Sequence, residues 1–105
     1  MLGIGQAIRS FRVRKGLSQK DVALSANITP SFLSQVEGGH RTASLTVLRR
    51  IADALEVAVE VLVWDAVELP EGMNEDDRRM CEFAKLIVRR VYENASRAGH
   101  GQGTI

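Results

Sequence analysis

The stretch "GLSQKDVALSANITPSFLSQVEGGHR", residues 16–41, decides the fold because it encodes two short helices around one sharp turn. Ser18 can cap the first helix, with Asp21 reaching back as a shorter version of the usual capping-box carboxylate. Asn27 follows that helix, and asparagine is one of the few residues that tolerate positive φ. Ala23 is small enough for two crossing helices to approach closely. We therefore expect a compact pair of helices in this stretch.

The second helix of the pair has an unusually bare face. Thr29 is expected to cap it, and Pro30 takes its first helical position, where the missing N–H is not needed. Apolar residues at helical spacing should face the core, namely Ile28, Leu33 and Val36. The outward side is left with short and mostly polar residues, which are Pro30, Ser31, Ser34 and Gln35. Two short helices joined by a three-residue turn indicate helix-turn-helix geometry.

Further helices are predicted on either side of this pair. A first helix carries the apolar stripe Ile4, Ile8 and Phe11 and should end near Gly16. A fourth helix is capped by Ser44 and has apolar residues at three- and four-residue spacing, which are Leu45, Leu48, Ile51, Ala52 and Leu55. Residues 57–64 alternate in a way that locally favours a strand. After a break at residues 70–72, Asn74 can cap a long last helix.

Composition limits the possible classes of protein. The chain has 105 residues, enough for one domain or a small domain with an appendage. Its only cysteine, Cys81, excludes an intrachain disulfide and fits a reducing compartment; within the apolar stripe of the last helix we expect it to be a small buried residue. No segment is long and apolar enough to span a membrane, and the first residues lack the pattern of a secretory signal. We therefore expect a cytoplasmic protein.

Charge is distributed unevenly along the chain. The net charge is +1, but residues 1–64 contain eight Lys or Arg against five Asp or Glu, whereas residues 65–105 contain six against eight. The basic excess therefore falls in the part of the chain that holds the helix pair. By itself such an excess usually marks a solvated face. It is compatible with an anionic partner but does not indicate one.

The motifs "GLSQKDVALSANITPSFLSQVEGGHR" and "SLTVLRRIADAL" together resemble the phage-repressor-like helix-turn-helix proteins, which include lambda repressor and Cro. The resemblance runs from about Ile4 to Leu62. It implies an all-α fold with a compact five-helix DNA-binding domain at residues 1–66, in which residues 59–63 form a short helix despite their strand propensity. Residues 67–98 would be a linker and a C-terminal amphipathic helix, and residues 99–105 a flexible tail.

The resemblance also implies which residues meet double-stranded DNA, since the second helix of the motif enters the major groove in this family. The matching positions are Gln19, Thr29, Pro30, Ser31, Ser34, Gln35, Gly39, His40 and Arg41. Gln19 matches a position that contacts phosphate and braces the recognition helix. Arg12 and Glu37 match a buried structural ion pair, although Arg12 could instead belong to the basic patch. Pro30 departs from the pattern because it replaces a long base-reading side chain.

The last helix has a broad apolar stripe, formed by Met80, Phe83, Ala84, Ile87, Val88 and Val91. This stripe could pack on its own domain, form a homodimer, or do both with different edges. A two-fold dimer would bind a pseudo-palindromic site. A second hypothesis is an antitoxin-type module whose last helix binds another protein while the domain represses its own operon.

Other chemistry has little support in the sequence. His40, His100 and one cysteine make no metal cluster, and no catalytic constellation or phosphate loop can be assembled from residue spacing. We expect no cofactor, no metal and no enzymatic activity. The sequence predicts a bacterial or phage transcriptional regulator associated with the nucleoid, a repressor rather than an activator.

Overall fold

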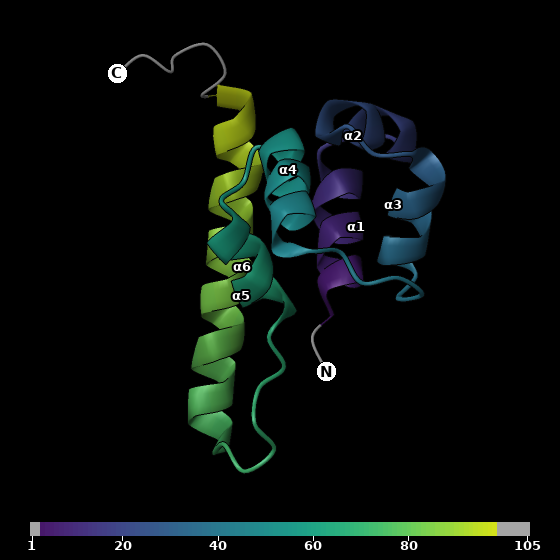
Figure 1. Ribbon diagram of the computed structural model, residues 1–105. Coiled ribbons are helices and arrows are strands. Elements are labelled where there is room, and N and C mark those ends of the chain that lie inside the picture. Colours follow the sequence, from purple (N-terminus) through teal and green to yellow (C-terminus); the bar gives the residue numbers. More distant parts are fainter. Residues whose placement is uncertain (1–2, 99–105) are drawn as a thin grey trace.

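The computed structural model describes residues 3–98, with side chains through residue 94, and this part of the chain forms six helices (Figure 1). They are α1 (Ile4–Arg14), α2 (Gln19–Ala26), α3 (Pro30–Glu37), α4 (Leu45–Leu55), α5 (Val59–Ala66) and α6 (Glu75–Ala98). No strand occurs within residues 3–98. The predicted all-α fold, five helices followed by a C-terminal helix, is confirmed. The tail predicted at 99–105 lies outside the described residues.

Several helices begin or end at the capping residues that the sequence predicts. The Ser18 hydroxyl accepts the Asp21 N–H at 3.0 Å, and the Asp21 carboxylate accepts the Ser18 N–H at 3.1 Å, which completes the capping box. These bonds lower the pKa of Asp21, mainly because the carboxylate accepts the backbone N–H of Ser18. Asn27 closes α2 in the left-handed conformation with φ of 59°. Thr29, Ser44 and Asn74 cap α3, α4 and α6 through their side-chain oxygens.

Residues 59–66 are helical although their alternating β-branched pattern favours a strand. Leu62 is fully buried and Ala66 nearly so, because α5 packs against α1 and α4. A lone strand would leave backbone groups unpaired at this place, whereas a helix satisfies them within the segment. Tertiary packing therefore overrides local propensity here.

The core lies between the first five helices. Its largest fully buried side chains are Phe11, Ile8, Leu33, Ile51, Leu55, Leu62 and Val22. Ala23 is also fully buried, as expected for the small residue where α2 and α3 pack. Gly5 fits an even closer approach: a Cβ atom there would lie 2.2 Å from the Val36 carbonyl oxygen. The start of α1 thus touches the backbone at the end of α3.

Helix α6 stands against α5 and α1, on the side of the molecule opposite α3 (Figure 1). Its contacts with the domain include the core-packed Tyr92 and two charged side chains. The Arg89 guanidinium pairs with the Asp65 carboxylate at 2.7 Å, and the Lys85 ammonium donates to the Val67 carbonyl and lies 5.6 Å from the centre of the Trp64 ring. No helix within residues 3–98 has both the length and the apolar character needed to cross a membrane.

The predicted apolar stripe of α6 is divided by this arrangement. Ala84 and Val88 are half-buried, whereas Met80, Phe83, Ile87 and Val91 are exposed. Cys81 is half-buried, so the expectation of a buried cysteine was wrong. The stripe is therefore only partly used by its own chain.

Candidate nucleic-acid interface

Helix α3 divides cleanly into a buried side and an exposed side. Leu33 and Val36 are buried in the core, and Ile28 packs against it from the preceding turn. The four residues expected to face outward are all exposed, namely Pro30, Ser31, Ser34 and Gln35. The Thr29 hydroxyl accepts the Phe32 N–H at 3.0 Å and so fixes where the helix begins. The result is a flat surface of short side chains with one longer amide.

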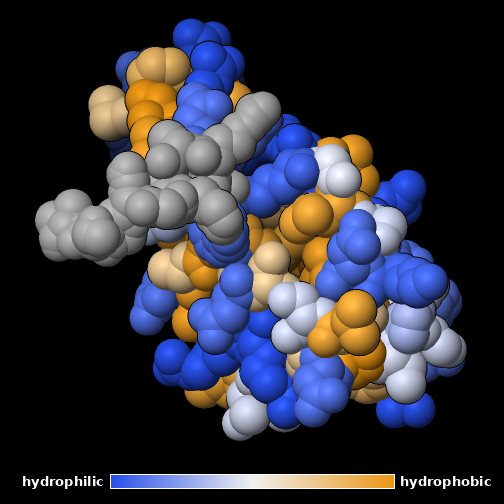
Figure 2. All heavy atoms as spheres, turned by 90° about the horizontal axis from the view of Figure 1, so that it is seen from above, coloured by the Kyte–Doolittle hydropathy of each residue, from blue (hydrophilic) through white to orange (hydrophobic). Residues whose placement is uncertain are grey.

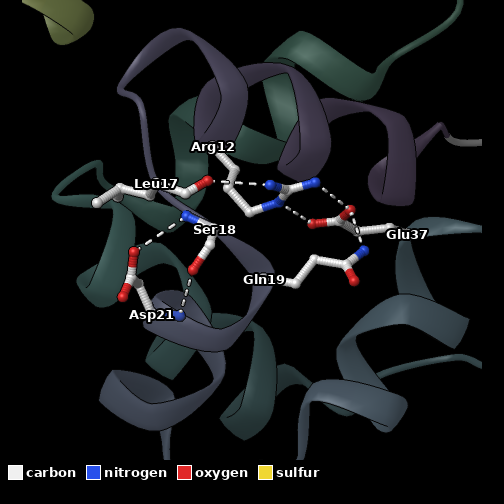
Figure 3. A network of polar contacts seen from close by, with 6 residues as sticks. All are labelled: Arg12, Leu17, Ser18, Gln19, Asp21 and Glu37. Carbon is white, nitrogen blue, oxygen red and sulfur yellow. Dashed lines mark hydrogen bonds and ion pairs between the residues drawn. The ribbon is translucent and has the colours of Figure 1, made fainter.

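A buried polar network holds α3 in place from behind (Figure 3). The expected pair between Arg12 and Glu37 is present and bidentate: Arg12 Nε donates to one carboxylate oxygen at 2.7 Å and Nη2 to the other at 3.0 Å. Arg12 Nη1 also donates to the Leu17 carbonyl at 2.9 Å, and Gln19 Nε2 donates to Glu37 at 2.9 Å. Four groups from α1, the following loop, α2 and α3 are thus joined.

The network is well shielded from solvent. The side chain of Glu37 is only 4% exposed and that of Arg12 12%. The hydrogen bonds to Glu37 raise the pKa of Arg12 above its ordinary value, against a smaller opposing effect of burial. Within the described residues every buried side-chain nitrogen and oxygen has a partner. Such fully satisfied networks fix one arrangement of the elements they join.

Gln19 joins α2 to α3 because its side-chain amide donates to Glu37. Its amide nitrogen carries two N–H donors, and Glu37 accepts only one of them. The second donor is left over for another acceptor, and Gln19 itself is half-exposed at the first position of α2. Its contact with a DNA phosphate stays a prediction.

The loop after α3 is tied back to the helix that it follows. The Gln35 carbonyl accepts the N–H groups of His40 and Arg41 at 2.8 and 3.2 Å, and Gly39 makes the turn with φ of +80°. Gly39, His40 and Arg41 are all exposed. Backbone hydrogen bonds therefore join the residues predicted to contact phosphate to Gln35, which is predicted to contact a base edge.

Three residues of this surface were not predicted from the sequence. Phe32 lies under the Arg41 guanidinium, 5.5 Å from ring centre to charge, and so positions that cation. Gly5 supports the end of α3 through its backbone contact, and the Leu17 carbonyl completes the coordination of Arg12. Only Phe32 gave a signal in the sequence, because it is a large aromatic residue off the apolar stripe of α3.

Comparison with known proteins assigns the fold to one family. The model of the helix-turn-helix family matches residues 8–62, which span α2, α3 and most of the five-helix domain. The chain belongs to this family, and within it to the phage-repressor-like helix-turn-helix proteins.

Two curated relatives extend the match beyond the helix pair. The immunity repressor protein of Bacillus phage phi105 is 31% identical over 90 residues, which cover 86% of this chain and 60% of that protein. The regulator SinR of Bacillus subtilis is 34% identical over 85 residues, covering 80% of this chain and 73% of SinR. This chain thus spans less than two thirds of the phage repressor.

Solved structures agree with this assignment. The restriction-modification controller protein C.AhdI from Aeromonas hydrophila has a TM-score of 0.56 and 34% identity, covering 58% of this chain and 92% of that one. The clp gene regulator ClgR from Corynebacterium glutamicum aligns over 98% of this chain and 93% of its own, with a TM-score of 0.54 and 21% identity. The second match concerns the fold alone, and it includes the region of α6.

Proposed function

We propose that this regulator binds a specific operator by placing α3 in the major groove of double-stranded DNA. The observation that carries the proposal is the exposed face of α3, whose short side chains let the helix approach a groove while the Arg12–Glu37 network holds it from behind. Long acidic side chains, which would repel phosphate, do not occur on this face.

Base reading would fall mainly to Gln35 and Ser31. A glutamine amide can donate to N7 and accept from N6 of one adenine, which discriminates against other bases by about 1–3 kcal/mol. Pro30 has no donor and would offer only apolar contact, for example to a thymine methyl. One bidentate contact is too little to specify an operator, so DNA shape and a second half-site would supply the remainder.

Backbone contacts would come from both ends of the helix pair. The free N–H of Gln19 and the start of α2 would face one phosphate. Gly39, His40 and Arg41 would face the phosphates of the other strand, with Arg41 held in place by Phe32. Because the loop is bonded to Gln35, phosphate contact would set the register of base reading.

The protein would regulate transcription as a repressor. We infer a homodimeric repressor that acts in the bacterial cytoplasm at the nucleoid, on a pseudo-palindromic site whose half-sites are about 34 Å apart. It would act by occupying DNA, without catalysis or cofactor. The basic excess of residues 1–64 would give binding a steep dependence on salt.

Selection of binding sites from random duplexes, followed by anisotropy titration, tests this proposal. We expect one enriched half-site, repeated with two-fold symmetry, and affinity that falls steeply between about 50 and 200 mM salt. Gln35→Ala should relax the preference at one base pair, whereas the matched control Gln6→Ala, an exposed glutamine on α1, should leave it unchanged. No enriched sequence and no salt-sensitive binding would refute the proposal.

A second candidate is binding of another protein through α6, as in an antitoxin that represses its own operon. The exposed apolar residues of α6 favour a partner of some kind. A clean homodimer after purification from the native cell would argue against it, and a stoichiometric small partner would support it.

A further inference from the structure

The loop between α3 and α4 borders an apolar cavity at the N-terminal end of α1. Figure 1 shows this loop passing the start of α1 on its way to α4. The cavity has a volume of about 430 Å³, within the range of about 300–1,000 Å³ that is usual for sites of small ligands. Its apolar walls come from four helices and the loop, and they are Ile4, Val36, Leu48, Val63 and Ala43.

The walls of the cavity continue the hydrophobic core toward the surface. Val36 is buried in the core, and Ile4, Ala43 and Leu48 pack against it from the edge. Apolar walls offer water few hydrogen-bond partners, so an apolar molecule of suitable size can replace that water at little cost.

The polar groups at the cavity indicate the class of ligand. Among the residues that line it only Arg41 is charged, and Thr42 adds a hydroxyl group. Both residues are exposed, so they stand at the mouth, whereas the walls are buried or half-buried. The described residues include no carboxylate that pairs with Arg41. An apolar cavity with one cation at its mouth is complementary to an apolar molecule with one carboxylate.

Other parts of the surface lack this combination. A hollow between the linker and α6 is lined by three acids and three bases, which are Asp65, Glu68, Glu82, Arg78, Lys85 and Arg89. Arg89 is paired with Asp65, and Arg78 and Lys85 donate to backbone carbonyls. Figure 2 views the molecule from the end opposite the start of α1, and there hydrophobic residues reach the surface in patches among hydrophilic ones.

We propose that the cavity binds a small organic molecule with an apolar body and one carboxylate, and that its binding weakens binding of DNA. The apolar body would lie against Val36, Leu48 and Val63, and the carboxylate would bind Arg41. The coupling rests on the proposed function, in which Arg41 contacts a DNA phosphate. Ligand and DNA then compete for one guanidinium, and each must weaken the binding of the other by the same factor.

The loop also joins the cavity to the base-reading side of α3. The Gln35 carbonyl accepts the N–H groups of His40 and Arg41, and the Val36 carbonyl accepts the Gly39 N–H at 3.1 Å. Val36, which follows Gln35 in the chain, is itself a wall of the cavity. A ligand in the cavity therefore contacts the loop and the end of α3 from behind, where it can receive the signal that releases the regulator from its operator.

Titration of the full chain with sodium octanoate, followed by ¹H–¹⁵N NMR, tests the site. Gly5 and Gly39 line the cavity, and their amide resonances should shift and saturate, with a Kd on the order of 1 mM for a ligand of about ten non-hydrogen atoms. Gly16 and Gly72 do not line it and are internal controls. Acetate, which has the charge without the apolar body, should cause no shift. Absence of saturable shifts with both octanoate and 3-phenylpropanoate would overturn the proposal.

A variant that fills the cavity locates the site. Val63→Phe enlarges a wall on α5, outside the expected DNA contacts, and should abolish the octanoate shifts. The matched control is Val61→Phe, which alters a half-buried residue of the same helix that does not line the cavity. Circular dichroism checks folding, and Ala43→Leu fills the cavity from the loop if Val63→Phe does not fold. Octanoate shifts that persist in a folded, filled variant would overturn the proposal.

Anisotropy titration with the selected operator tests the coupling to DNA. Saturating octanoate should weaken operator binding about fivefold or more relative to equimolar acetate, which matches the ionic strength. The neutral analogue 1-octanol should weaken it less, because it has no carboxylate to compete for Arg41. In Val63→Phe, operator affinity should equal that of wild type and should not respond to octanoate. Equal operator affinities of wild type in octanoate and acetate would overturn the coupling.

The inference and the proposed function fail in different ways. If the operator is bound with a steep salt dependence but octanoate neither shifts Gly5 and Gly39 nor weakens that binding, only the cavity proposal is wrong. If octanoate saturates the cavity but no duplex is bound in a salt-sensitive way, the DNA-binding proposal is wrong although the cavity is a binding site.

Discussion

Helices α3 and α6 expose opposite kinds of surface. Helix α3 buries Leu33 and Val36 and exposes short polar residues, as a helix at the edge of a domain is expected to do. Helix α6 attaches through Lys85, Arg89 and the core-packed Tyr92, and it leaves most of its large hydrophobic residues exposed. The large hydrophobic residues of α3 are covered by its own chain, whereas most of those of α6 are not.

The two helices are held in position by different kinds of contact. A bidentate ion pair, a backbone contact at Gly5 and apolar packing all act on α3, so its exposed face is held rigidly for contact with a large ligand. Helix α6 has fewer apolar contacts with the domain, and its charged anchors lie nearer to solvent. We therefore expect substitutions in the contacts of α3 to destabilise the protein more than substitutions in the contacts of α6.

The largest effect is expected when the anchor of α3 is broken. Arg12→Met leaves the buried Glu37 carboxylate with Gln19 as its remaining donor, and loss of one partner of a buried pair should lower the free energy of unfolding by about 3 kcal/mol. Urea titration measures this. Arg79→Met, which breaks a 3.8 Å pair with Glu75 between exposed side chains, should cost about 0.5 kcal/mol or less. Equal costs for the two variants would show that the network does not hold α3.

A second test acts on the backbone behind α3. Gly5→Ala would put a methyl group 2.2 Å from the Val36 carbonyl oxygen, so α1 and α3 must separate, at a cost of about 2 kcal/mol. DNA affinity should fall as well, because the end of α3 and its loop would shift. Gly3→Ala is the control, since its nearest neighbour is the Gln6 side chain at 3.6 Å. Identical melting curves for both variants would contradict the close contact.

The anchor of α6 should be weaker than that of α3. Arg89→Met removes a single hydrogen-bonded pair with Asp65, and we expect a loss of about 1 kcal/mol in unfolding free energy. The control Arg49→Met removes an exposed arginine on α4 and should change stability little. A loss as large as that of Arg12→Met would mean that α6 is held as firmly as α3.

The smallest effect concerns the start of α2 and depends on pH. Because the folded state lowers the pKa of Asp21, its carboxylate stabilises the fold above the ordinary pKa of 3.8, and this contribution is lost as pH falls through the lower folded value. Asp21→Asn should therefore lower the melting temperature slightly at pH 7, and the difference from wild type should shrink below about pH 4. Thermal melts at both pH values measure it, and a difference independent of pH would rule out a role for the charge.

Most local features of the fold could be predicted from single residues. Ser18, Thr29 and Ser44 begin helices because their hydroxyls satisfy N–H groups that the helix leaves free, and this depends on neighbours a few positions away. Asn27 ends α2 for an equally local reason. The exposed face of α3 followed from the spacing of Leu33 and Val36. The expected pairing of Arg12 with Glu37 came instead from the resemblance, because the two residues are 25 positions apart.

Tertiary structure alone decided the rest. The sequence of residues 59–66 favours a strand, and only packing against α1 and α4 makes it a helix. The support of α3 by Gly5 depends on a backbone that comes close only after folding. Above all, the sequence determined that α6 has an apolar stripe but not which side the domain would take. Polar anchors from α5 and the linker settled that choice, and they left Phe83 and Ile87 to face outward.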